Sequence, residues 1–471
     1  MMWKWWRWID GRRESLGPVA WAACPCVKGK VRHEQEPKRS EDPSTVASHP
    51  HATVNFRLIV TLGTVFLLFG CSEQQGSTAQ KPIVLRVITA GGPNRIVERE
   101  AADRFCAKNP GVTVEFMDAP GRDYYVKALA TLAAGGDLDI LWMGSGFGLF
   151  SWRGALLPLD SLIQADPDFP IEKYYTPVVD WYRHRGELLG IPYGIDAQAI
   201  AYNRAAFDAA GVPFPSPDWT FDHYVEMAGR LSAFGKANPA ACRFGAGVDK
   251  IAPYYFGLSL IDEAGTQSGL QGESAEEWMR TNVELLRGGR TFLRVGAQGT
   301  LDRLSEFLQG RVAMVEAYTW DVGELRDRAR FPWALAVNPL GKDGRRAGWA
   351  SSSGFSISAR SKHPCEAWLL LKELVGAEAQ KSLMEVTIPA RTDLQAQYLE
   401  VNGLPQANLN ALLEMLPSVR TPARVPELME VSQELDYWFE LALEQNSGGK
   451  DIVPLLNQSI NRILSTSPAR Q

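Results

Sequence analysis

The sequence has 471 residues, of which 45% are hydrophobic and 22% charged, with 49 basic against 54 acidic side chains. This length predicts two or three domains, and the ordinary apolar and charged fractions exclude a chain that is disordered throughout. A formal net charge of −5 argues against a nucleic-acid-binding protein, and six cysteines are too few for a disulfide scaffold. Because no apolar run reaches about 18 residues, no ordinary transmembrane helix is expected.

The first 53 residues do not have the pattern of a folded domain. They show no sustained helix or strand period, and five of the fifteen tryptophans lie within the first 21 residues. Cys24-Pro25-Cys26 would suggest a metal or redox site, but no partner pair of ligands follows at the required spacing. We interpret residues 1–53 as a non-native or disordered extension and expect translation to start near Val54.

Residues 54–70 have the layout of a secretory signal. Arg57 supplies a positive charge, a 12-residue apolar stretch follows, and Gly70 precedes Cys71. The stretch is too short for a stop-transfer helix, although a short buried helix is the alternative interpretation. Residues 68–71 (LFGC) resemble a bacterial lipobox, in which the cysteine carries the lipid, so Cys71 is the predicted attachment site. Residues 71–81 then form a polar tether.

The next segment alternates predicted strands and helices. Residues 83–89 (IVLRVIT) favour a strand, 96–108 a helix, 112–117 a strand, 124–134 a helix and 138–143 a strand. Units of this length predict a parallel sheet with right-handed crossovers. Ligands of such sheets bind beyond the carboxyl ends of the strands, which here are residues 90–92 and 142–147.

The remainder continues the α/β pattern. Residues 189–203 are an apolar, extended stretch that we interpret as a crossing between two lobes. Further helices are expected at 221–232, 275–286, 301–308, 364–374, 426–445 and 451–464, and further strands at 311–316, 333–337 and 349–357.

Several segments, in this order and spacing, resemble the carbohydrate-binding family of extracellular solute-binding proteins of ATP-driven importers, of the maltose-binding-protein type. The segments are Gly190-Ile191-Pro192-Tyr193, Ala201-Tyr202-Asn203-Arg204, residues 307–314 (FLQGRVAM), Ser356-Ile357-Ser358 and Ile388-Pro389-Ala390-Arg391. The resemblance runs over residues 82–464. It implies two α/β lobes joined by a hinge, each lobe a mixed sheet flanked by helices, with the ligand in the cleft.

The resemblance also implies lobe limits. Lobe 1 would comprise residues 82–194 plus 346–390, and lobe 2 residues 195–345 plus 391–471. Closure about the hinge would let both lobes contact one ligand. The implied protein is a lipid-anchored, monomeric receptor that passes its ligand to a membrane permease. It would need no cofactor or metal, bind no nucleic acid, and lie in the periplasm or on the outer face of the cytoplasmic membrane.

A sugar site needs aromatic rings for stacking and polar groups for hydroxyls. The candidates for such contacts are Trp320, after the predicted 311–316 strand; Asp196, on the crossing; Tyr254; Trp438, beside Tyr437; Trp142; and Trp349. Each has an alternative structural role, as a core ring, an ion-pair partner or a turn cap. After the first strand, where some members carry sugar-binding side chains, this sequence has a Gly-rich loop in which backbone N–H groups or Arg95 could substitute.

Other functions remain as alternatives. The same fold could bind glycerol phosphate, a polyamine or an amino-acid derivative, and a phosphate would require clustered Arg or Lys at the cleft. A sensor could present the ligand to a receptor kinase instead of an importer. A glycan-active enzyme would need two facing carboxylates, for which Asp196 and Glu316 are the conceivable pair, although Glu316 is expected near the surface.

Overall fold

The computed structural model describes residues 82–92, 94–119, 123–287, 291–295, 301–346, 348–403, 405–416, 419–420 and 425–467. The predicted extension, signal, tether and lipid-attachment residue Cys71 lie outside these residues. Within the described residues, no helix is both long and apolar enough to cross a membrane.

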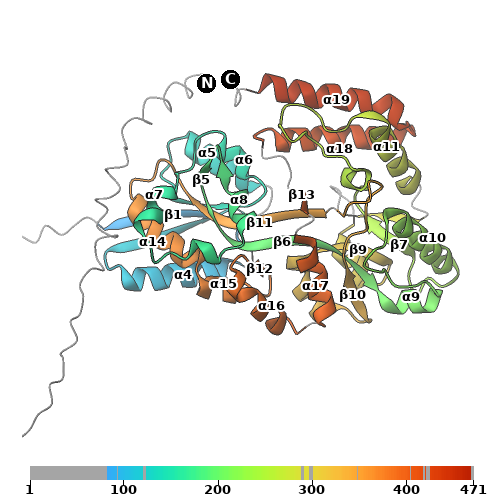
Figure 1. The fold of residues 1–471 in the computed structure, drawn as a ribbon, viewed down its shortest axis with the longest axis horizontal. Helices are drawn as coiled ribbons and strands as arrows, with labels where there is room; N and C mark the ends of the chain where they lie inside the picture. Colours follow the sequence, from blue (N-terminus) through green and yellow to red (C-terminus); the bar gives the residue numbers. More distant parts are fainter. Residues whose placement is uncertain are drawn as a thin grey trace, which may run out of the picture.

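The chain forms two α/β lobes side by side (Figure 1). The first five elements of lobe 1 alternate as the sequence predicts: β1 (Ile83–Thr89), α4 (Asn94–Lys108), β2 (Val112–Asp118), α5 (Asp123–Ala133) and β3 (Ile140–Met143). Both β2 and β3 pair with β1 in parallel, which confirms the predicted parallel sheet. Short elements that the sequence pattern did not predict follow: α6 (Phe147–Ser151), α7 (Asp160–Ala165), η3 (Ile171–Lys173), α8 (Thr176–Trp181), β4 (Arg183–His184) and β5 (Glu187–Leu188).

Strand β6 (Ile191–Asn203) is buried along its whole length and joins the two lobes. Its end, Asn203, becomes the N-cap of α9 (Arg204–Ala210), because the Asn203 side chain accepts a hydrogen bond from the backbone N–H of Ala206. The chain then builds lobe 2 from α10 (Phe221–Ala237), β7 (Phe244–Val248), η4 (Pro253–Phe256), α11 (Gly272–Leu286), β8 (Phe292–Arg294), α12 (Arg303–Leu308), β9 (Val312–Tyr318), η5 (Thr319–Asp321), α13 (Val322–Arg328) and β10 (Trp333–Ala336).

The chain returns to lobe 1 through β11, and its last two helices lie on lobe 2. The returning elements are β11 (Gly348–Ile357), α14 (Pro364–Val375), α15 (Ala377–Ser382) and β12 (Ile388–Pro389). The last elements are η6 (Thr392–Leu394), α16 (Gln395–Val401), α17 (Gln406–Met415), β13 (Val419–Arg420), α18 (Leu428–Gln445) and α19 (Gly449–Thr466). Helices α18 and α19 pack on α11 along the upper edge of lobe 2 in Figure 1.

One hydrogen-bonded ladder runs through both lobes in the order β2-β1-β3-β11-β6-β9-β7-β8. Strand β6 exchanges partners along its length. It pairs with β11 as far as Ala197, opposite Ala350, and with β9 from Gln198, opposite Tyr318. Strand β12 also pairs with the first part of β6, and β10 with the second. The exchange at Ala197 and Gln198 is therefore the point where the two sheets meet.

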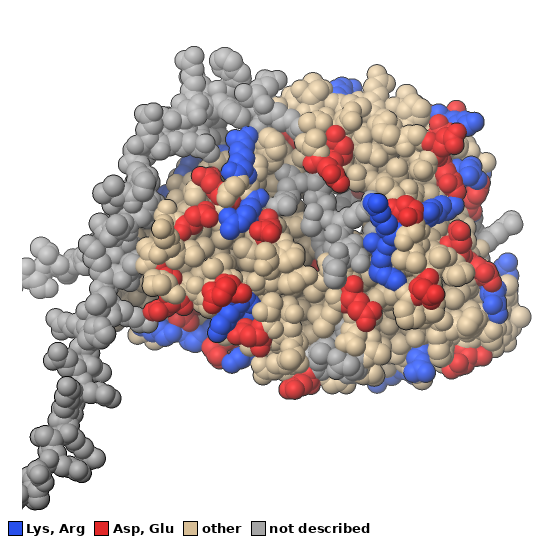
Figure 2. Space-filling view, viewed as in Figure 1, with Lys and Arg blue, Asp and Glu red and all other residues tan. Residues whose placement is uncertain are grey.

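Two hydrophobic cores stabilise the lobes. The larger core surrounds Trp368 in lobe 1 and continues into lobe 2 through Phe307 and Val315. The second core surrounds Trp219 and Trp278 in lobe 2, and all three tryptophans are fully buried. Acidic and basic side chains are interspersed over the face that Figure 2 shows, on both lobes. The expected two-lobe α/β architecture is confirmed, and it leaves several other tryptophans for the space between the lobes.

Candidate functional site

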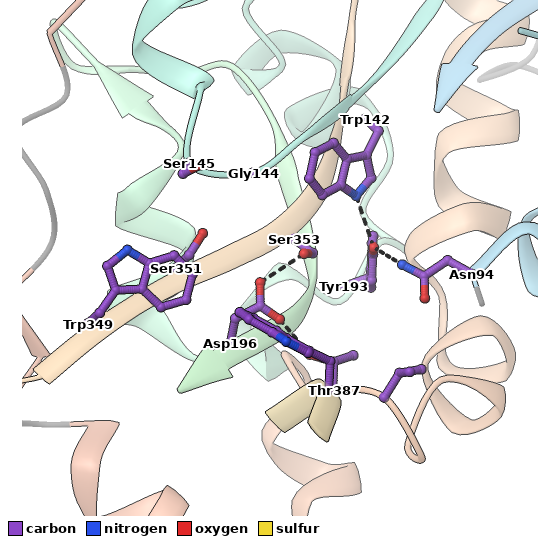
Figure 3. Close-up of a pocket in the computed structure, with 12 residues that line it drawn as sticks. Asn94, Trp142, Gly144, Ser145, Tyr193, Asp196, Trp349, Ser351, Ser353 and Thr387 are labelled. Atoms are coloured by element: carbon purple, nitrogen blue, oxygen red, sulfur yellow. Dashed lines mark hydrogen bonds between the residues drawn. The ribbon is translucent and has the colours of Figure 1, made fainter. Parts of the chain in front are cut away.

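A cavity of about 420 Å³ lies between the lobes, where β6 and β11 pass from one to the other. It lies at the carboxyl end of β3, in agreement with the rule for parallel sheets. Lobe 1 contributes the start of α4 and the residues that end and follow β3, while the crossing strands supply the base (Figure 3). Lobe 2 contributes Trp320, and the segment before β12 contributes Val386 and Thr387.

Two tryptophans from different elements form one aromatic wall. Trp320 stacks on Tyr318 with ring centroids 4.6 Å apart and planes 7° from parallel. Trp349 meets Trp320 edge-on, with centroids 5.8 Å apart and planes at 81°. Because Trp320 is 42% exposed although it is stacked on one side, its other face is available to a flat apolar surface of a solute.

The carboxyl group of Asp196 forms the polar base of the cavity. It is only 8% exposed, and its two oxygens accept hydrogen bonds from the hydroxyl groups of Ser353 (2.9 Å) and Thr387 (3.3 Å). Burial raises the pKa of Asp196 to about 6. Among the described residues no Lys or Arg forms an ion pair with it or lines the cavity. The carboxylate therefore still has acceptor capacity for hydroxyl or ammonium groups of a solute.

The lobe 1 wall is fixed by hydrogen bonds to one hydroxyl oxygen. Tyr193 accepts hydrogen bonds from the indole N–H of Trp142 (3.0 Å) and from the side-chain amide of Asn94 (2.9 Å), as Figure 3 shows. The ring of Tyr124 packs edge-on against Trp142, with centroids 5.3 Å apart. The indole of Trp142 is thus held in place before any solute arrives.

The structure brings four of the six predicted contact residues together, namely Trp142, Asp196, Trp320 and Trp349. Tyr254 does not line the cavity. Its hydroxyl donates a hydrogen bond to the side chain of Gln198 (3.1 Å), and its ring packs against Tyr255.

Trp438 also lies away from the cavity lining. It packs half-buried against the lobe 2 core, and its indole N–H donates to the carboxylate of Glu434 (3.2 Å). The adjacent Tyr437 is 60% exposed. On the described residues, this pair of aromatic side chains on α18 therefore belongs to the surface and core of lobe 2.

Sequence reasoning missed part of the lining. Arg95, the expected substitute in the loop after β1, forms an ion pair with Asp118 (2.5 Å), and its neighbour Asn94 lines the cavity instead. Thr387 and Val386 were not singled out. The available signal was their position directly before the Ile388-Pro389 motif, which pairs with the first half of β6.

The conceivable catalytic pair is not assembled. Glu316 on β9 pairs with Ile200 on β6. Ile200 lies four residues after Asp196, which places Ile200 roughly 13 Å from Asp196 along the strand. Glu316 is half-buried. Its carboxyl group is desolvated, which raises its pKa, and interacts with Gln198 and Arg303. Because Glu316 does not line the cavity, the two carboxylates do not flank one bond. Within the described residues, no cluster of His, Cys, Asp and Glu could hold a metal ion.

Comparison with known proteins adds the family. Residues 92–381 match the family model described as bacterial extracellular solute-binding protein. The chain belongs to this family. It is a non-enzymatic solute-binding protein that acts outside the cytoplasm, in the periplasm or the extracellular space.

Relatives and structures of this family are similar to the chain over most of its length. A putative binding protein of Brucella abortus (strain 2308) is 25% identical over 346 residues, which cover 71% of this chain and 81% of the relative. An ABC substrate-binding protein from Listeria monocytogenes, solved in complex with cycloalternan, superposes with a TM-score of 0.70 at 20% identity, covering 82% of this chain and 99% of that one. UgpB from Mycobacterium tuberculosis, in complex with glycerophosphocholine, superposes with a TM-score of 0.67 at 19% identity. This match covers 82% of this chain and 99% of UgpB. The two structural matches show the periplasmic-binding-protein fold.

Proposed function

We propose that this protein captures a sugar or oligosaccharide in the interlobe cavity and delivers it to the permease of its ABC transporter. The supporting observation is the lining itself: three indoles and one buried carboxylate, with no Lys or Arg among the described lining residues. Sugars present flat C–H faces to aromatic rings and hydroxyl groups to acceptors such as Asp196. The cycloalternan complex of the Listeria protein is consistent with this proposal.

A cationic solute is the second candidate, because the same lining would also suit it. The uncompensated carboxylate of Asp196 and the exposed face of Trp320 could hold an ammonium group by charge and by cation–π attraction. A polyamine is the corresponding solute class. Glycerol phosphate is less well matched, because a phosphate needs Arg or Lys donors that the described lining lacks.

We also propose that the protein is a monomer anchored to the membrane by lipid at Cys71. The support is the sequence of residues 54–71, which combines a positive charge, an apolar stretch and a small residue before the cysteine. We further propose that lobe 1 comprises residues 82–194 plus 346–390 and lobe 2 residues 195–345 plus 391–471. The lobes would move relative to each other about the point where β6 exchanges its strand partners.

The proposal is tested by thermal unfolding of the purified protein against a panel of mono- and oligosaccharides, with spermidine and glycerol 3-phosphate as comparison solutes. A solute at 100 times its dissociation constant adds roughly 2.7 kcal/mol to the stability of the folded state and raises the melting temperature. Trp320→Ala should weaken binding of the active sugar roughly tenfold to a hundredfold, because a stacking surface is lost.

Tyr437→Ala is the matched control, since it also removes an exposed aromatic ring but one that does not line the cavity. It should leave the sugar-induced shift unchanged. If spermidine raises the melting temperature and no sugar does, the solute is a cation and not a carbohydrate. Equal loss in both variants would show that the cavity is not the binding site.

A further inference from the structure

A second cavity, of about 340 Å³, lies between the lobes outside the candidate solute site. Lobe 1 lines it with Trp152, which follows α6, and with the β4–β5 hairpin. Lobe 2 lines it with Glu263 and Gly265 from the segment before α11, and with Val425 from the approach to α18. The cavity thus separates surfaces that belong to different lobes, and it would narrow if the lobes moved together.

Arg185 is presented to this cavity in a fixed manner. It is one of two non-glycine residues with positive φ among the described residues, at 52°, in the turn of the β4–β5 hairpin. Its guanidinium lies over the ring of Trp152, 5.3 Å from the centroid, and the ring of His184 packs on the same indole at 5.2 Å. Because the indole is covered in this way, it is a support for Arg185 and not a free surface for stacking a solute.

The charge of Arg185 is not compensated by a carboxylate within the described residues. The charge of the nearby Arg183, in contrast, is compensated, because Arg183 forms ion pairs with Asp160 and Asp180, each at 3.4 Å. Across the cavity, Glu263 is exposed and has no ion-pair partner within the described ranges either. A cation and an anion, one from each lobe, therefore line the same space without a partner.

A second set of opposite charges, beside this cavity, also has its cation on lobe 1 and its anions on lobe 2. Arg153, next to Trp152, is close enough to Glu427 and Glu430 of lobe 2 to feel their charges, which oppose the lowering of its pKa by burial. Basic groups of lobe 1 thus face acidic groups of lobe 2 at this part of the interlobe boundary. Attraction between such groups favours the approach of the two surfaces.

We propose that Arg185 and Glu263 form an ion pair when the lobes close on a solute, and that this pair raises solute affinity without touching the solute. The apparent affinity of a binding protein falls with the fraction of molecules in the binding-competent state. An ion pair made only in the closed state increases that fraction. The proposal needs the solute-binding function of the family, and it does not depend on the solute being a sugar.

Charge reversal tests the pair. The variants are Arg185→Glu, Glu263→Arg and the double reversal, with Glu400→Arg on α16 as control, because it makes the same charge change at an exposed site that does not line the cavity. Calorimetric titration uses maltotriose, spermidine and glycerol 3-phosphate as probes. Each single reversal places like charges across the cavity and should weaken binding of the active probe by roughly threefold to tenfold. The double reversal should restore it to within about twofold, and the control should match the parent.

A second readout needs no solute. The radius of gyration from small-angle X-ray scattering of the solute-free protein should be larger in both single reversals than in the parent and the double reversal. If none of the three probes binds, the scattering pattern alone decides whether the ion pair forms, and the carbohydrate proposal is decided by the sugar panel. The inference is overturned if the single effects simply add in the double reversal, or if all variants match the parent in both measurements.

Discussion

Burial of the carboxyl group of Asp196 destabilises its charged form. The group is buried beside two hydroxyl groups without a cationic partner among the described residues, and its pKa is raised from 3.8 to about 6. The folded state therefore binds this proton more tightly than the unfolded state. The stability contributed by the protonated group is complete below pH 3.8 and is lost as the pH rises through 6.

We therefore expect Asp196→Asn to stabilise the solute-free protein at pH 7 by up to about 3 kcal/mol, because the desolvated charge is removed. The gain should shrink between pH 6 and pH 4. Urea unfolding of parent and variant over this pH range measures the difference. Glu98→Gln is the control. Because burial raises the pKa of Glu98 to about 7, the stability difference between this variant and the parent should change with pH at higher pH values than for Asp196→Asn. A less stable Asp196→Asn protein at pH 7 would contradict the assignment.

At the scale of elements, the side chain of Gln198 lies at the partner exchange in β6. Its oxygen accepts hydrogen bonds from the backbone N–H of Trp349 (2.9 Å) and from the hydroxyl of Tyr254 (3.1 Å), and the residue is 1% exposed. Gln198 also interacts with the carboxylate of Glu316 on β9. One amide thus connects β6 with the start of β11 and with lobe 2, directly beside the aromatic wall of the cavity.

Gln198→Leu should leave the N–H of Trp349 and the carboxylate of Glu316 without this partner, at a cost of roughly 1–3 kcal/mol for each buried group. We expect faster hydrogen exchange at the Trp349 amide and roughly tenfold weaker solute binding, because the indole of Trp349 is less well positioned.

Tyr254→Phe removes only the other donor and should retain the protection of the Trp349 amide. Amide exchange followed by NMR distinguishes the two variants. Unchanged exchange at Trp349 in Gln198→Leu would show that Gln198 does not position this element.

At the scale of the whole molecule, the solute cavity and the proposed lipid anchor lie in different parts of the chain. The cavity is formed by the two lobes, whereas Cys71 precedes β1. Cys71→Ala should abolish incorporation of labelled palmitate and release the protein into the soluble fraction, since the modified thiol is absent. Solute affinity should be unchanged, because the described cavity lining begins at Asn94. Cys106→Ala, which changes a free half-buried cysteine, is the control and should keep the label. Label retained in Cys71→Ala would disprove the anchor.

Much of the fold could be predicted, because local patterns specify it. The strand–helix alternation of residues 83–143 gave the parallel sheet, and the Asn203 motif marks a strand end that caps a helix. The short elements between β3 and β6 were missed because five or six residues are too few to show a period. Trp142 and Trp349 were located because they end and begin predicted strands at the cleft, and Trp320 because the family resemblance implies a tryptophan after the 311–316 strand.

The sequence by itself determined the class of protein, the α/β order of the elements and a site rich in tryptophan with one carboxylate, because periodicity and motif order are properties of the chain. Only the tertiary structure decided which groups share a cavity. It placed Asn94 in the cavity lining and Thr387 beside Asp196, and it directed the hydroxyl of Tyr254 to Gln198. It also placed Arg185 and Glu263 in the lining of one cavity between the lobes. These proximities join residues far apart in the chain, and they arise from the packing of the two lobes about β6, which no local pattern encodes.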